Sequence, residues 1–252
     1  MMENCALNGF YSPAQRARFL QAVGHRFSVR TFSGEADPAK LSALRYAAEH
    51  VALPGVRIVI AKCEEHKLYK KLPGVAAVSG TGQYAAIIAD TTHPYARYHA
   101  GISGEAFMLE IFSLELGGCW IGSFKKRGIS IPLKKNEKVL AVIPFGTFDG
   151  PMNPRKRKKL TDICTHDPTQ WPLWAYHAAE CVRNAPSAIN LQPWRMNYAG
   201  RTLMLQKKGL GTRLDMGIAL LHMSLGMGEK EHVIRWEDGK NVASLLAEDR
   251  VL

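Results

Sequence analysis

The stretch Ala185-Pro-Ser-Ala-Ile-Asn-Leu-Gln-Pro-Trp-Arg195 joins a helical pattern of apolar residues to a segment that reads as a strand. Its two prolines stiffen the chain, and the small residues after the first proline let the backbone approach a flat ligand. The amides of Asn190 and Gln192 offer donors and acceptors to the polar edge of a planar heterocycle. The alternative interpretation is a stiff surface loop without a ligand.

The residues around this loop repeat an order of features found earlier in the chain. Tyr46–Val51 and His177–Val182 share four of six residues. Each is followed by a proline, then by a strand that begins at an arginine, and later by a helix with a Gly-x-Ala start. These strands and helix starts are Arg57–Ala61, Arg195–Ala199, Gly104–Ala106 and Gly217–Ala219. The shared order indicates two divergent copies of one unit, with boundaries at residues 1–159 and 160–252.

The apolar pattern predicts the remaining elements. Apolar residues at helical spacing follow Asp37, which is a predicted N-cap, and Pro38, which takes the first helical position. A second helical stripe runs from Ile102 to Leu116 and should end at Gly117. Further helices are predicted behind Pro172 and at Gly217–Leu225. Strands are predicted at Val56–Ala61, Tyr84–Ala89 and Val139–Phe145, with hairpins near 196–205 and 233–242. This mixture favours an α+β or α/β sandwich.

Composition excludes several classes of protein. The 252 residues are 46% hydrophobic and 22% charged, which argues against a disordered chain, and no apolar run approaches the length of a membrane helix. Residues 1–12 lack the segments of an export signal, and the five cysteines form no Cys-x-x-Cys pair. We therefore expect reduced thiols in a cytoplasmic protein. The nine histidines show no metal-ligand spacing.

Positive charge is concentrated in residues 125–159. This stretch has eleven Lys and Arg against two acids, which is +9 of the total charge of +11. Such a patch attracts phosphate groups, nucleic acid or an acidic surface, or is simply a solvated basic loop. Two prolines and a glycine within 150–159 mark this part as the best candidate for a linker.

Arg26-Phe-Ser-Val-Arg30 is a second candidate for ligand binding. In an extended segment alternate side chains share a face, so Arg26, Ser28 and Arg30 would point one way and the two apolar residues into the protein. Two guanidinium groups and a hydroxyl suit a phosphate monoester. An amphipathic edge strand with exposed arginines is the alternative.

Gly117-Gly-Cys-Trp-Ile-Gly-Ser-Phe124 is a third candidate, because its glycines permit close contact with a ligand. It could equally be a helix cap and a turn. The chain has no Gly-x-Gly-x-x-Gly motif and no P-loop, so a dinucleotide-binding fold of the Rossmann type is not indicated.

Together the three segments resemble the FMN-dependent nitroreductase family. That family has an Arg-x-Ser-x-Arg type segment, a Gly-Leu-Gly-x-x-Trp-Ile-like loop and an Ala-Pro-Ser-x-x-Asn-x-Gln-Pro-Trp loop. Ile143–Phe148 and Arg155–Arg157 are similar to its last core strand and its basic pair. The resemblance spans most of residues 20–252, and residues 185–194 are its most specific part.

The order of the motifs differs from that of ordinary members, in which the Pro-Ser-x-x-Asn loop comes before the glycine-rich loop. The resemblance therefore implies the branch in which two subunits are fused into one pseudo-dimeric chain. The implied fold is α+β, a nitroreductase-like three-layer sandwich made of two divergent half-repeats. One FMN per chain follows, and a monomer could bind it.

Family members divide the flavin contacts between two subunits, which the two halves would replace. The resemblance implies phosphate contacts from Arg26, Ser28, Arg30, Arg155 and Arg157. Gly122 and Ser123 would present backbone near the reactive nitrogen of the ring. The ring and ribityl chain would be lined by Pro186, Ser187, Ala188, Asn190 and Gln192.

The implied activity is ping-pong hydride transfer from NADH or NADPH through FMN to a nitroaromatic or quinone-like acceptor. The flavin carries this chemistry, so we nominate no catalytic acid, base or nucleophile, and no metal. The basic residues of 125–138 could steer the anionic nicotinamide cofactor. A flavin-binding sensor or storage protein without turnover is the alternative. Nucleic-acid binding is disfavoured because the basic stretch 125–159 lacks interleaved aromatic residues, apart from Phe145 and Phe148 in an apolar strand and at its end.

Overall fold

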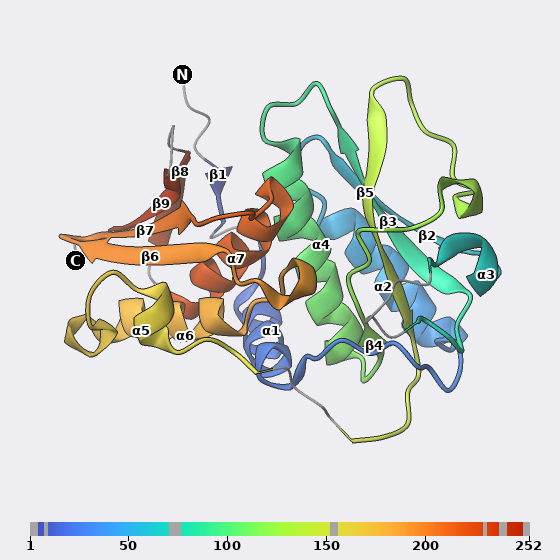
Figure 1. Ribbon diagram of the computed structural model, residues 1–252, viewed down its shortest axis with the longest axis horizontal. Helices are drawn as coiled ribbons and strands as arrows, with labels where there is room; N and C mark the ends of the chain where they lie inside the picture. Colours follow the sequence, from blue (N-terminus) through green and yellow to red (C-terminus); the bar gives the residue numbers. More distant parts are fainter. Residues whose placement is uncertain are drawn as a thin grey trace. The chain divides into compact units, whose positions relative to one another are not determined.

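The computed structural model describes residues 5–7, 10–70, 77–151, 156–228, 231–236 and 241–248. The chain divides into two compact units (Figure 1). One is formed by residues 25–155, and the other by residues 1–24 together with 156–252. The N-terminal segment thus groups with the C-terminal part of the chain, whereas the sequence boundaries of 1–159 and 160–252 kept it with the first half.

The unit 25–155 contains a four-stranded antiparallel sheet. Its strands are β2 (Val56–Lys62), β3 (Gln83–Asp90), β5 (Glu137–Gly146) and β4 (Gly117–Gly118), in the order β2-β3-β5-β4. In the register Ile58 pairs with Ile87, and Ala86 pairs with Val142. Residues 84–89 of β3 are all buried, as a central strand covered on both faces requires. The three strands predicted in this region are confirmed.

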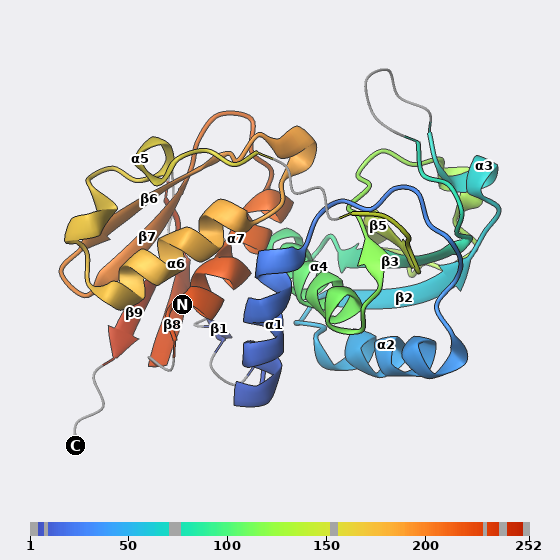
Figure 2. The same cartoon turned by 90° about the horizontal axis from the view of Figure 1, so that it is seen from below.

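Helices α2 (Pro38–His50) and α4 (Ala96–Ser113) pack on β2 and β3 (Figure 2), and two short helices, α3 (Glu65–Leu68) and η1 (Lys126–Gly128), complete the unit. Helix α2 begins as predicted, because a side-chain oxygen of Asp37 accepts the amide of Lys40 at 2.9 Å. Helix α4 is apolar on nearly every side and is buried along most of its length.

A buried cluster lies on one face of this sheet. It includes Tyr84, Ala86 and Ile88, which alternate along β3, together with Val29 and Phe32 from the segment that precedes α2. Alternate residues of a strand share one face, so a single strand anchors this cluster. Burial of these side chains therefore fixes the course of residues 26–32.

The other unit contains a five-stranded antiparallel sheet in the order β1-β8-β9-β7-β6. These strands are β1 (Cys5–Ala6), β8 (Glu231–Trp236), β9 (Asn241–Glu248), β7 (Thr202–Lys207) and β6 (Trp194–Ala199). Both hairpins predicted in this part of the chain are confirmed, except that the turn at 238–239 lies outside the described residues.

The helices of this unit are α1 (Pro13–His25), α5 (Leu160–Ile163), η2 (Pro168–Gln170), α6 (Leu173–Asn184), η3 (Ala188–Asn190) and α7 (Arg213–Gly226). Helices α6 and α7 pack so closely that a Cβ on Gly226 would lie 2.5 Å from Cα of Ala178. The N-terminal segment is attached to α7, because the Tyr11 and Ser224 hydroxyls are 2.6 Å apart and Arg16 Nη2 donates to the carbonyl of Leu225 at 2.9 Å.

The α+β class predicted from the sequence is confirmed, since helices cover sheets that are antiparallel throughout. The order helix, antiparallel strand pair, helix occurs in both units, as α2, β2 with β3, α4 and as α6, β6 with β7, α7. This order supports the repeat seen in the sequence. That the two units derive from two subunits fused into one chain stays a prediction.

An ion pair ties the start of β5 to β2. Arg57 Nε and Nη2 donate to the two carboxylate oxygens of Glu137 at 2.7 and 2.6 Å, and the amide of Lys134 donates to Oε2 at 2.8 Å. These hydrogen bonds, that from Arg57 first, lower the pKa of Glu137 to about 2. Arg57 also donates to the carbonyl of Pro132 at 2.7 Å. The pair therefore holds part of the basic stretch 125–138 against the sheet.

We expect Glu137→Gln to lower the free energy of unfolding at pH 7 by about 1 kcal/mol, since the charge-assisted bonds are partly solvent-screened. The folded pKa of Glu137 is depressed, so its contribution is present above the unfolded value of 4.5 and is lost as the pH falls towards about 2. Urea titrations at several pH values should show the two proteins converging over that range. Glu64→Gln, which removes an exposed pair with Lys67, is the control and should change little. A difference independent of pH would contradict this account.

Candidate functional site

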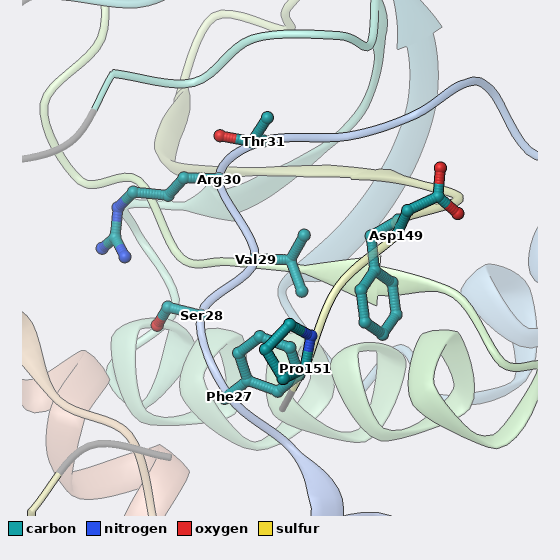
Figure 3. Close-up of a pocket in the computed structure, with 8 residues that line it drawn as sticks. Phe27, Ser28, Val29, Arg30, Thr31, Asp149 and Pro151 are labelled. Carbon is teal, nitrogen blue, oxygen red and sulfur yellow. The ribbon is translucent and has the colours of Figure 1, made fainter. Parts of the chain in front are cut away.

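Residues 26–30 form an extended segment whose side chains alternate as predicted. The amide of Val29 donates to the carbonyl of Gly118 at 3.1 Å, and the Val29 side chain is buried. In Figure 3 the side chains of Ser28 and Arg30 lie on the opposite side of the segment from Val29. The structure therefore brings the hydroxyl and one of the two predicted guanidinium groups to a common side.

A cavity of about 340 Å³ lies along this segment. Its aromatic wall contains Phe27 and Phe148, whose ring centroids are 5.5 Å apart. The full lining is Phe27, Ser28, Val29, Arg30, Thr31, Phe148, Asp149 and Pro151. Ligand pockets commonly hold roughly 300–1,000 Å³, so this cavity has room for part of a cofactor-sized molecule.

Arg30 gives the cavity its positive charge. Its Nε is buried and forms no hydrogen bond with any residue of the described ranges. Asp149 lies on the far side of the cavity from Arg30 in Figure 3. A guanidinium with an unfilled donor beside a serine hydroxyl suits an anionic group rich in oxygen. On this observation the residues fit the phosphate of FMN.

Arg26 lies elsewhere. Its side chain is 2% exposed, and its Nε is 3.7 Å from Oε1 of Glu105 on α4. Burial lowers the pKa of Arg26, and the charge of Glu105 acts in the opposite direction. The first arginine of the motif is therefore a buried partner of a carboxylate rather than an exposed cation.

The loop 117–124 presents an open turn. Gly122 and Ser123 are exposed, and a Cβ on Gly122 would meet no atom within 4 Å. The loop is fixed just before this turn, where Ile121 and Val142 exchange backbone hydrogen bonds of 2.9 and 3.0 Å. The space beside Gly122 leaves its backbone accessible to a ligand, and the predicted contact with the flavin ring stays a prediction.

In the other unit, the loop 186–192 has a strained backbone. The φ angles of Ile189, Asn190 and Gln192 are 44°, 61° and 47°. Left-handed backbone is unfavourable for residues with side chains, most of all for a β-branched isoleucine. Strain of this kind costs about 1–3 kcal/mol per residue and persists only where neighbouring groups impose it. Ile189 is nonetheless 76% exposed, so the loop holds an apolar side chain out in the open.

Side-chain hydrogen bonds hold the loop in this conformation. The amide of Gln192 donates to Oγ of Ser187 at 2.8 Å, and Oε1 of Gln192 accepts the amide of Lys158 at 2.9 Å. Oδ1 of Asn190 accepts Nη1 of Arg157 at 2.8 Å. Gln192 is buried, whereas Ser187 and Asn190 are half-buried. The side-chain amides of Asn190 and Gln192 thus stabilise the conformation of the loop. The contacts with the flavin ring that are predicted for them stay a prediction.

The remaining predicted residues are placed as follows. Pro186 is buried and Ala188 is exposed. Arg157 also donates to the carbonyl of Ala185 at 3.1 Å, so it anchors the loop, and its predicted phosphate contact stays a prediction. Arg155 lies outside the described residues.

Asp215 supports the loop 186–192 and was missed by the sequence reasoning. It is 3% exposed, its Oδ1 accepts the amide of Ala188 at 2.9 Å, and its Oδ2 accepts the amide of Thr212 at 2.9 Å. Thr212-Arg-Leu-Asp215 has the spacing of a capping box, which signals the start of α7. The contact with the loop leaves no signal in that spacing, because the two segments are far apart in sequence.

Two thiols of this unit, those of Cys164 and Cys181, have raised pKa values. Burial raises the pKa of Cys164 to about 12 and that of Cys181 to about 11, so both stay protonated at neutral pH. Within the ranges that the structure describes, no cluster of His, Cys, Asp or Glu could hold a metal ion. None of the described helices combines the length and apolar character needed to cross a bilayer.

Comparison with known proteins identifies the class. The family model "Putative TM nitroreductase" matches residues 18–227. The chain therefore belongs to this nitroreductase family, as its motifs predict. Comparison with curated proteins found no match.

A solved structure from Thermotoga maritima shows the same fold, and two further solved structures match part of this chain. The crystal structure of a "putative nitroreductase" from Thermotoga maritima is 23% identical, with a TM-score of 0.63 over 92% of this chain and 94% of that one. A nitroreductase family protein from Streptococcus pneumoniae is 16% identical and covers 59% of this chain and 100% of that one, with a TM-score of 0.49. An FMN-dependent nitroreductase from Clostridium difficile is 17% identical, covers 57% and 94%, and has a TM-score of 0.41.

Proposed function

We propose that the protein is an FMN-dependent oxidoreductase of the nitroreductase type, which uses NADH or NADPH to reduce a nitroaromatic or quinone-like acceptor by a ping-pong cycle. Membership of the nitroreductase family supports the reaction class. The observation that carries the cofactor assignment is Arg30, whose buried Nε has no partner among the described residues and which lies on the same side of its segment as Ser28.

In this proposal each group of residues binds a different part of the cofactor. Ser28 and Arg30 bind the phosphate. The backbone at Gly122 and the loop 186–192 contact the ring and ribityl chain. FMN, when bound, supplies the hydride chemistry. The protein orients the cofactor, and no side chain is assigned as a catalytic acid or base.

Purified protein tests the proposal directly. We expect a yellow protein whose flavin is released on denaturation and is identified as FMN by chromatography. Steady-state oxidation of NADH and of NADPH with a quinone or nitroaromatic acceptor then separates an enzyme from a flavin-binding sensor or storage protein. Bound FMN without turnover for any acceptor would favour the second function.

We expect one FMN per chain. The Arg-x-Ser-x-Arg segment occurs once, and the corresponding residues 161–169 include α5 and η2 instead. The proline-rich loop also occurs once, because the earlier copy passes from Pro54 to the strand at Val56 with no loop between them. A second site would lack both a charged partner for the phosphate and a wall for the ring. Titration of flavin-free protein locates the equivalence point, and two equivalent sites per chain would contradict the pseudo-dimer. A monomer that binds flavin would support it.

A further inference from the structure

Three polar side chains, of which Arg26 and Glu105 are buried and Trp120 is half-buried, link the segment 26–30 to α4 and to the loop that follows α4. Arg26 Nε lies 3.7 Å from Oε1 of Glu105, and the indole Nε1 of Trp120 donates to Oε2 of Glu105 at 2.7 Å. The side chains of Arg26 and Glu105 are 2% and 0% exposed. Trp120 also lies directly on Gly104, where a Cβ would be 2.3 Å from its Cη2. Glu105 is therefore fixed by an indole on one side and faces a guanidinium on the other.

This ion pair changes which arginine can offer positive charge to a ligand. Away from water, a carboxylate within 4 Å balances most of the field of a guanidinium. A phosphate placed at Arg26 would meet the charge of Glu105 at a similar distance and would lose its hydration there. Arg30 has no such neighbour, since it forms no ion pair within the described ranges.

We propose that Arg26 is a positioning residue held by Glu105, and that Arg30 is the cation of this segment that binds phosphate. The proposal rests on the proposed function, because the phosphate is that of FMN. It departs from the expectation that both arginines of the motif bind phosphate. Nε and Nη1 of Arg26 form no hydrogen bond with the described residues, and they suit a neutral oxygen, such as an ordered water, because Glu105 already balances the charge.

The proposal predicts how the affinities for two ligands, FMN and riboflavin, change in variants of the protein. Riboflavin has the ring and ribityl chain of FMN but no phosphate. A positioning residue affects both ligands alike, since it sets the course of the backbone from 26 to 30. A phosphate-binding residue affects FMN alone. The ratio of the dissociation constants for riboflavin and FMN therefore separates the two roles, whatever the absolute affinities.

Glu105→Gln is the first test, because the amide keeps the shape of the side chain and an oxygen for Trp120 while removing the negative charge. Titration of flavin-free protein, followed by flavin fluorescence, should give a ratio within about twofold of that of the wild type. If Arg26 bound the phosphate, the unmasked charge would tighten FMN binding selectively. A rise of the ratio by about tenfold or more would overturn the proposal.

The double variant Arg26→Met with Glu105→Gln is the second test. Each single variant leaves one buried charge without its partner, the guanidinium in Glu105→Gln and the carboxylate in Arg26→Met, and is expected to be destabilised. The double variant has neither charge, and its ratio of the dissociation constants for riboflavin and FMN should also stay within about twofold of the wild-type ratio. A fall of this ratio by about tenfold would show that Arg26 binds phosphate.

Thermal unfolding of the four proteins in this cycle adds a readout that needs no flavin. The double variant should have a higher midpoint than Arg26→Met, and additive shifts would show that the pair is not coupled. Failure of the proposed function is distinguishable from failure of this inference. Wild-type protein that binds neither flavin refutes the function and the phosphate assignment with it, whereas wild-type protein that binds both, with a ratio that moves in these variants, refutes the positioning role alone.

Discussion

Arg30→Ala is expected to weaken FMN binding by about 10- to 150-fold and to leave riboflavin binding nearly unchanged. A charge-assisted hydrogen bond to an ionised group contributes about 1.5–3 kcal/mol, and about 1.4 kcal/mol corresponds to a factor of ten in affinity. Arg30 can supply such a bond because its Nε is buried without a partner in the described ranges. Isothermal titration of flavin-free protein with each ligand measures both constants.

The salt dependence of FMN binding gives an independent check. Removal of the phosphate-binding cation should flatten the dependence of the FMN dissociation constant on ionic strength. Arg45→Ala is the matched control, since it removes one exposed cation from α2 of the same unit. It lowers the net charge equally and should change neither flavin constant. Equal losses for FMN and riboflavin in Arg30→Ala would show that Arg30 supports the structure instead.

The sequence predicts the elements of this fold well where burial alone determines them. The central strand at 84–89 is a short run of apolar residues, and the structure buries all of it. The start of α2 follows from Asp37 and Pro38, which act within a single turn of helix. Helix α1 was missed, although Ser12 and Pro13 give it a start signal of the same kind as Asp37 and Pro38. A single sequence therefore predicts an element where local capping residues mark its start or where a run of apolar residues indicates a large buried area.

The candidate site is less predictable because its side chains are positioned by partners that are distant in sequence. Alternation correctly places Ser28 and Arg30 on one side of the segment, but it also places Arg26 with them. Arg26 turns inward because Glu105, 79 residues further along the chain, offers a buried carboxylate. Two acids within an otherwise apolar helix, Glu105 and Glu110, were the available signal for such a pair.

The loop 186–192 shows the same limit. The sequence indicates a stiff segment with two amides, and these amides are predicted to face a ligand. In the structure Gln192 and Asn190 form hydrogen bonds with the chain at 156–158, which the sequence does not predict. No spacing within the loop encodes these bonds, and none predicts the left-handed backbone at Ile189. Tertiary hydrogen bonds impose both features.

Asp215→Ala is expected to have the largest effect in the unit formed by residues 1–24 and 156–252. It removes the carboxylate that accepts the amides of Ala188 and Thr212, and each hydrogen bond to a charged group contributes about 1.5–3 kcal/mol. We therefore expect a loss of about 3–5 kcal/mol in the free energy of unfolding, measured with urea. The strained loop also loses its tether to α7, so we expect the affinities for FMN and riboflavin to fall together.

Thr212→Ala separates the two consequences. It removes the hydroxyl that caps α7 and accepts the amide of Asp215 at 3.1 Å, which costs about 1 kcal/mol, but it leaves the bond from Asp215 to Ala188 intact. This variant should lose stability and keep both flavin affinities. Folded Asp215→Ala protein, titrated well below its unfolding midpoint, should bind both flavins more weakly with an unchanged ratio. Unchanged affinities in that protein would show that the loop 186–192 does not contact the cofactor, whereas a selective loss of FMN would place the phosphate at this loop rather than at Arg30.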